Sequence, residues 1–133
     1  MHGYMASCAA ASAQKAALDA LSGPQDCISE MVEEYNRRRD LIVRGLNEID
    51  GFQCQPPKGT FYAFPNVSRL GLLSARISEQ LLEQAKLAAI PGSAFGEAGE
   101  GYLRLSFATS QSNILEGLSR IKKWRTHCEK FAH

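Results

Sequence analysis

The run Tyr102-Leu103-Arg104-Leu105-Ser106-Phe107 contains the side chain best suited to chemistry in this sequence, the guanidinium of Arg104. Apolar and polar residues alternate along it, which is typical of a half-buried strand. One face would carry Leu103, Leu105 and Phe107, and the other Tyr102, Arg104 and Ser106. Because the apolar face must pack on helices, Arg104 would point away from the core, where its planar fork could hold a carboxylate through two parallel hydrogen bonds. The pattern by itself favours a solvated arginine or a structural ion pair.

Two further segments could lie beside such a site. The loop 91–101 holds four glycines, Gly92, Gly96, Gly99 and Gly101, which would let backbone approach a ligand or would make a flexible connection. No Gly-Lys-Ser/Thr follows, and a strand comes next, so this is neither a nucleotide-phosphate loop nor a dinucleotide fingerprint.

The segment Pro57-Lys58-Gly59-Thr60-Phe61-Tyr62 could be a turn that feeds a strand. In that reading Gly59 supplies unusual backbone angles, Phe61 belongs to the core and Lys58 is solvated.

Composition narrows the class of protein. The chain has 133 residues, 44% of them apolar and 22% charged, with a net charge of +1. These values indicate a soluble globular domain, and they argue against a nucleic-acid surface or a basic membrane patch. The sequence shows no bilayer-spanning segment, no signal peptide at Met1 and no metal-binding spacing among Cys8, Cys27, Cys54 and Cys128. We therefore expect a cytoplasmic protein with free thiols, no nucleic-acid partner and no membrane partner.

The order of predicted elements indicates the fold class. Apolar periodicity predicts helices at 12–21, 26–48, 74–86 and 110–125. Strands are predicted at 52–55, 60–64, 87–90 and 102–107, with a loop at 66–71. Residues after 125 are expected to fray. The sequence thus predicts an α+β fold: a two-layer small domain with a short, mostly antiparallel sheet covered by helices, plus a long linker helix.

Several stretches, in this order along the chain, together resemble the class I aminotransferases of the fold-type I pyridoxal-phosphate enzymes. The most diagnostic are Pro91-Gly92-Ser93-Ala94-Phe95-Gly96 and Gly99-Glu100-Gly101-Tyr102-Leu103-Arg104-Leu105-Ser106-Phe107-Ala108. Supporting stretches lie at 7–8, 12–18, 23–24, 31–35, 37–42 and 57–64, so the resemblance covers nearly the whole chain to Trp124. A smaller departure is Lys86, where the family often has glycine after a helix.

The resemblance implies roles for three residues. Arg104 would hold the α-carboxylate of the substrate, Phe61 would lie beside the substrate, and Gly59 would allow close approach there. The implied reaction moves an amino group between an amino acid and a 2-oxo acid, with pyridoxal phosphate as electron sink.

The family also needs a lysine that forms a Schiff base with the cofactor. None of the lysines stands in the family's sequence context for it: Lys15, Lys58, Lys86, Lys122, Lys123 and Lys130. We therefore expect no catalytic or cofactor-binding residue in this chain, no bound pyridoxal phosphate and no activity of the chain alone.

The implied organisation is that of a fragment. Residues 1–25 would pack on a missing N-terminal pyridoxal-phosphate domain, 26–125 would form the C-terminal small domain with its linker helix, and 126–133 a tail. The full-length protein would be a homodimer. The alternative is a short protein that reuses this domain as a non-catalytic ligand-binding or regulatory module.

Overall fold

The computed structural model describes residues 8–130, which fall into two compact units, Met1–Val32 and Glu33–His133. In the first unit the alanine-rich segment forms helix α2 (Ala11–Ser22), as predicted. Gly23 ends it by donating its backbone N–H to the Asp19 carbonyl over 2.9 Å. Every residue of α2 is exposed, including Leu21 with 84% of its surface accessible, so this helix has no core of its own.

The long helix is also confirmed. Helix α3 (Asp26–Asn47) begins in the first unit and continues through the second. The apolar residues of α3 are buried only toward its C-terminal end, at Ile42 and Leu46, whereas Met31 is exposed. On the polar side Glu34 pairs with Arg38 over 2.7 Å and with Arg37 over 3.0 Å, at the spacings that stabilise a helix surface.

The described residues of the second unit form a three-stranded sheet in the order β1-β3-β2, antiparallel throughout. The strands are β1 (Tyr62–Ala63), β2 (Ile90–Pro91) and β3 (Leu103–Ser106). They are shorter than predicted. The strand predicted at 52–55 is wrong: only an isolated bridge joins Gln53 to Asn66 there, since the two prolines that follow cannot donate to a ladder. The loop at 66–71 contains a 3-10 turn, η1 (Ser68–Leu70).

Helices α4 (Ser74–Ala85) and α5 (Gln111–Lys130) complete the unit. Helix α5 continues past the predicted end at residue 125, so 126–130 are helical rather than frayed; 131–133 lie outside the described residues. Leu82, predicted on the inner side of α4, is instead 56% exposed, while Ile77, Leu81 and Ala85 are buried.

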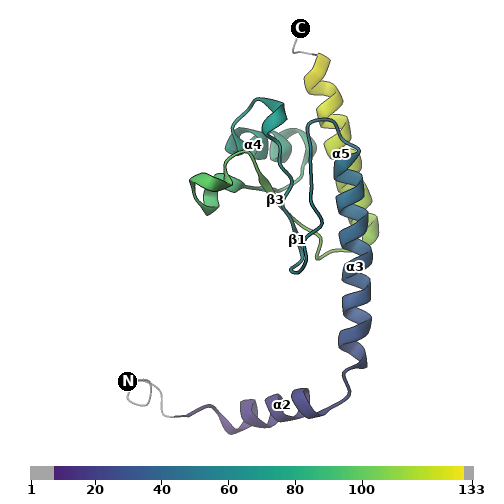
Figure 1. Cartoon of the computed structure of the whole chain (residues 1–133), viewed down its shortest axis with the longest axis vertical. Helices are drawn as coiled ribbons and strands as arrows, with labels where there is room; N and C mark the ends of the chain where they lie inside the picture. Colours follow the sequence, from purple (N-terminus) through teal and green to yellow (C-terminus); the bar gives the residue numbers. More distant parts are fainter. Residues whose placement is uncertain (1–7, 131–133) are drawn as a thin grey trace. The chain divides into compact units, whose positions relative to one another are not determined.

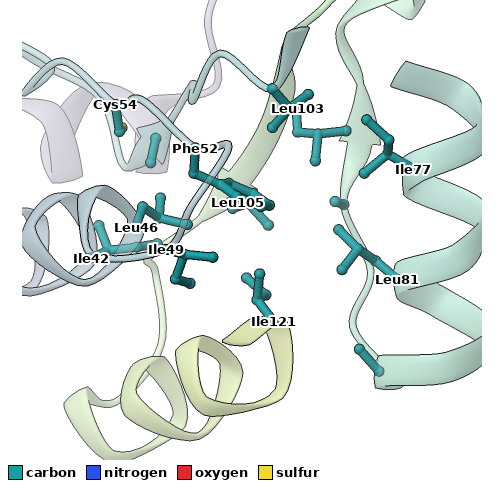
Figure 2. Packing of buried hydrophobic residues seen from close by; sticks show 14 of the residues in the cluster. Ile42, Leu46, Ile49, Phe52, Cys54, Ile77, Leu81, Leu103, Leu105 and Ile121 are labelled. Carbon is teal, nitrogen blue, oxygen red and sulfur yellow. The ribbon is translucent and has the colours of Figure 1, made fainter. Parts of the chain in front are cut away.

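The layers are those of the predicted α+β fold. In Figure 1 the second half of α3 runs beside α5, with strands β1 and β3 to one side of this pair. Figure 2 shows Leu103 and Leu105 of β3 between residues of α3 and α5 and residues of α4. Helices therefore cover one face of the sheet, and Leu46, Leu103 and Ile121 are almost completely buried in the core between the two layers.

Candidate functional site

The face of the sheet that points away from the helices is built around Arg104. Cross-strand partners share a face, and the register pairs Ile90 with Arg104 and Tyr62 with Ser106. Tyr62, Ile90, Arg104 and Ser106 therefore lie on one side, which we call the outer face. Leu103 and Leu105, on the other side, are 0% and 5% exposed. The predicted orientation of Arg104 is confirmed.

Two separate aromatic rings lie against the guanidinium of Arg104. Its Cζ atom is 4.4 Å from the ring centroid of Tyr62 and 4.7 Å from that of Phe95. These are cation–π distances. Among the side chains described, those of residues 8–128, no carboxylate pairs with Arg104, so it is not part of a structural ion pair there. The guanidinium is half-buried and lies beside two rings, and a guanidinium can bind a carboxylate through two parallel N–H bonds.

The aromatic surroundings extend beyond these two rings. Phe64 stacks on Tyr102 with centroids 5.2 Å apart and meets Phe95 edge-on at 6.2 Å. Phe95 is 53% exposed, and Phe64 and Ile90 are exposed as well. A positive charge within an exposed apolar surface makes the outer face the candidate site for a ligand or for another protein part.

Phe61 lies next to this cluster. Its ring centroid is 4.5 Å from that of Tyr62 and 6.4 Å from that of Tyr35, and its backbone carbonyl accepts the Phe107 N–H over 2.9 Å. The ring is 41% exposed, so Phe61 is not the core residue of the simpler turn reading. The ring of Tyr62 thus lies against both the ring of Phe61 and the guanidinium of Arg104.

Gly59 is not brought into contact with the cluster. Nothing lies within 4 Å of the point where a Cβ atom would stand, and the unusual backbone angle predicted for Gly59 belongs to the next residue, Thr60, with φ of 65°. A β-branched residue rarely adopts this left-handed conformation. The bend into β1 therefore depends on Thr60.

The glycine-rich loop folds tightly on itself as η2 (Gly92–Phe95) and η3 (Glu97–Gly99). Gly92 and Gly99 cross with their backbones so close that a Cβ atom on Gly92 would lie 1.9 Å from the Gly99 carbonyl oxygen. These glycines thus permit packing within the loop. Sequence reasoning assigned no role to Tyr62 or Phe95; strand alternation could have placed Tyr62 beside Arg104, but nothing local indicated Phe95.

Among the described side chains, no lysine makes a hydrogen bond, ion pair or cation–π contact with Arg104 or with the rings beside it. In residues 8–128 the lysine side chains are all exposed, and Lys15 is the one that makes an ion pair. A hollow of about 430 Å³ between α4 and α5 is lined by Lys86 and Lys123, not by Arg104. The same residues contain no group of His, Cys, Asp or Glu arranged as metal ligands, and no helix able to cross a bilayer.

Comparison with known proteins gives the family. A family model described as "Aminotransferase class I and II" matches residues 1–121. The aspartate aminotransferase of Pyrococcus horikoshii is 42% identical over 92% of this chain and 32% of its own length. For the aromatic-amino-acid aminotransferase 2 of Thermococcus litoralis the values are 43%, 90% and 31%. The crystallised alanine aminotransferase from Pyrococcus furiosus superposes with a TM-score of 0.83 at 33% identity, covering 86% of this chain and 30% of that one.

These relatives share a scaffold but are named for different amino acids, and this chain spans about a third of their length. Strand β3 with Arg104, the aromatic residues beside it and the glycine-rich loop all lie within the matched residues. The match extends over most of the chain, and the chain therefore belongs to the class I and II aminotransferase family.

Proposed function

We propose that this chain is the C-terminal, carboxylate-binding part of a pyridoxal-phosphate-dependent aminotransferase, in which Arg104 holds the α-carboxylate of the amino acid or 2-oxo acid. The observation that carries the proposal is the half-buried guanidinium, which lies beside Tyr62 and Phe95 and has no acidic partner among the described side chains of residues 8–128. An unpaired, partly desolvated arginine on an exposed face is suited to an anionic ligand.

The geometry suits a planar carboxylate. The two rings beside the guanidinium would limit the directions from which a ligand can approach, and a carboxylate would accept two parallel hydrogen bonds along an N–H edge. Such a contact fixes direction as well as charge, and it would orient the substrate for removal of the α-proton. Phe61, exposed beside Tyr62, would border the bound substrate, and Gly59 would leave space near it.

The other half of the chemistry would come from the part of the protein outside this chain. The family resemblance implies pyridoxal phosphate as electron sink, and the Schiff-base lysine would be supplied by that part. The exposed apolar side chains of the first unit, among them Leu18, Leu21 and Ile28, would be covered by it. We expect the chain alone to be inactive, and the complete protein to be a cytoplasmic homodimer.

The proposal is tested by titrating the ¹⁵N-labelled chain with a dicarboxylic amino acid and with a 2-oxo acid. We expect saturable shifts of the Arg104 Nε–Hε signal, with a dissociation constant on the order of millimolar, as for a few solvent-accessible hydrogen bonds. Arg104→Lys keeps the charge but removes the two-pronged donor, so the shifts should be lost. Arg69→Lys, at an exposed arginine of the same unit, is the control for the chemical change and should bind as the parent does. No saturable shift in the parent chain would contradict the proposal.

Reduction with borohydride after addition of pyridoxal phosphate, followed by intact mass, tests the second part. We expect no stoichiometric lysine adduct on this chain. One lysine labelled to completion would show that the cofactor lysine is present here, and the chain would then be a compact enzyme. Carboxylate binding that persists when the complete protein forms no adduct either would make the domain a non-catalytic binding module.

A further inference from the structure

Glu100 joins the glycine-rich loop to the first turn of helix α4. One carboxylate oxygen of Glu100 accepts the backbone N–H of Ser74 over 2.7 Å, and the other accepts the Ser74 hydroxyl over 2.9 Å. Ser74 is completely buried, and its hydroxyl also lies 3.3 Å from that of Ser93 in the loop. The hydrogen bond from the Ser74 N–H, followed by that from its hydroxyl, lowers the pKa of Glu100 below its ordinary value. The carboxylate is thus the ionised acceptor of both bonds.

These bonds occupy a donor that would otherwise be unsatisfied. The first N–H groups of a helix have no partner within it, and Leu73, at the N-cap of α4, has no side chain that can accept. Glu100, 26 residues away along the chain, takes the place of a capping side chain. A local cap would have stabilised α4 equally well without involving the loop. The cap provided from the loop fixes the loop to the helix.

The two halves of the loop are joined by backbone contacts. The Gly92 N–H donates to the Tyr102 carbonyl over 2.8 Å, and the Gly99 N–H donates to the Gly96 carbonyl over 3.0 Å. The backbones of Gly92 and Gly99 also cross in close contact, so the segment with Phe95 is packed directly against the segment that leads to Glu100. Phe95 belongs to this loop, and its ring is one of the two that lie against Arg104.

We infer that Glu100 is a positioning residue: by binding the first turn of α4 it holds the glycine-rich loop so that Phe95 stays over the guanidinium of Arg104. The inference rests on the proposed function where it concerns substrate, because a preorganised arginine binds a carboxylate with less loss of side-chain freedom. The placement of Phe95 itself can be measured without any ligand.

The test compares two loop acids by NMR of the chain. The rings of Tyr62 and Phe95 should shift the Arg104 Nε–Hε signal away from that of a solvated arginine, and Phe95→Leu gives the signal expected when one ring is absent. Glu100→Gln should move the signal toward the Phe95→Leu position. Glu97→Gln, which alters an exposed acid of the same loop, should leave it unchanged.

Ser74→Ala removes the hydroxyl bond but keeps the backbone bond, so it should move the Arg104 signal in the same direction by a smaller amount. If Glu100→Gln disturbs the fold, Ser74→Ala tests the inference in its place. A changed Ser74 amide signal with an unmoved Arg104 signal would overturn the inference and leave Glu100 as a helix cap alone.

If Arg104 binds carboxylates as proposed, Glu100→Gln should weaken that binding about two- to fivefold, the equivalent of one exposed cation–π contact. Failure of the parent chain to bind would contradict the proposed function, but it would leave the effect of Glu100 on the Arg104 signal intact. The two ideas therefore fail on different measurements.

Discussion

Strand β3 is four residues long, and its two faces differ in burial, polarity and charge. On the inner face Leu103 and Leu105 are buried among aliphatic side chains of three helices (Figure 2). On the outer face Arg104 lies among aromatic rings that remain partly exposed. The inner face is complete without any further part, whereas the outer face has a charge without a counter-charge in the described residues. The comparison shows that alternate residues of one strand are divided between the buried core and a charged, partly exposed surface, and it is this surface to which we assign binding in our proposal.

The largest expected effect tests this division directly. Leu103→Ala should lower the free energy of unfolding by about 3 kcal/mol, because it removes a fully buried side chain and leaves a cavity. Arg104→Ala, one residue along, should lower it by about 1–2 kcal/mol, since the two cation–π contacts are lost but no core cavity is made. Urea unfolding followed by the fluorescence of Trp124 measures both. Equal losses in the two variants would mean that the outer face also holds the fold together.

The strained backbone of Thr60 allows a second test of how the outer face is held in place. Thr60, with φ of 65°, leads into β1 immediately before Phe61. Glycine adopts this conformation without a Cβ clash, so Thr60→Gly should raise the free energy of unfolding by about 1 kcal/mol after the greater flexibility of the unfolded chain is allowed for. It should also broaden the ring signals of Phe61 and Tyr62, which the bend positions. A destabilised variant would show that contacts of the Thr60 side chain outweigh its strain.

Lys86 shares the left-handed backbone conformation of Thr60 but lies away from the outer face, so it serves as the comparison. It follows α4 in the left-handed conformation, with φ of 52°, and its N–H donates to the Leu81 carbonyl as a helix C-cap. Lys86→Gly should raise the free energy of unfolding by about 0.5–1 kcal/mol, by the same mechanism as at Thr60. The Arg104 Nε–Hε signal should not change. A shift of that signal would show that α4 transmits changes at either end to the outer face.

How far the sequence could predict these features depends on the range of the interactions. The long helices follow from local periodicity, and Ile42, Leu46 and Trp124 are buried as their spacing indicated. The alternation of β3 likewise fixed the direction of Arg104. The strand predicted at 52–55 does not form, because the two prolines that follow have no N–H to donate to a neighbouring strand. Only one bridge to Asn66 forms there.

The remaining parts of the candidate site depend on contacts between distant segments. Phe95 reaches Arg104 because a glycine-rich loop folds back on itself, and Glu100 reaches Ser74 across 26 residues. No residue pattern within either segment encodes that meeting. The left-handed angle at Thr60 is similar: the neighbouring Gly59 is the residue that turn chemistry would select, and tertiary packing placed the strain on Thr60 instead.

The smallest expected effect concerns a surface that belongs to neither face. Glu34 on α3 binds Arg38 and Arg37, and Gln111 of α5 donates to both of its carboxylate oxygens over 3.3 Å. These bonds, that of Arg38 foremost, lower the pKa of Glu34 from 4.5 to about 2. A lowered pKa in the folded state means that the stabilisation is fully present above pH 4.5. It is lost progressively as the pH falls toward 2.

Glu34→Gln should therefore reduce stability slightly at pH 6 and make no difference near pH 2, because exposed ion pairs contribute little. The change of wild-type stability with pH also includes contributions from Glu100 and Glu116, whose pKa values are lowered by their hydrogen bonds. The informative quantity is the difference between wild type and variant in urea midpoint at pH 6, 4 and 2.5. A difference that stays constant down to pH 2.5 would mean that Glu34 acts through packing, not through its charge. In that case the contact between Glu34 and Gln111 would stabilise the protein by packing, as the side chains of the inner face do.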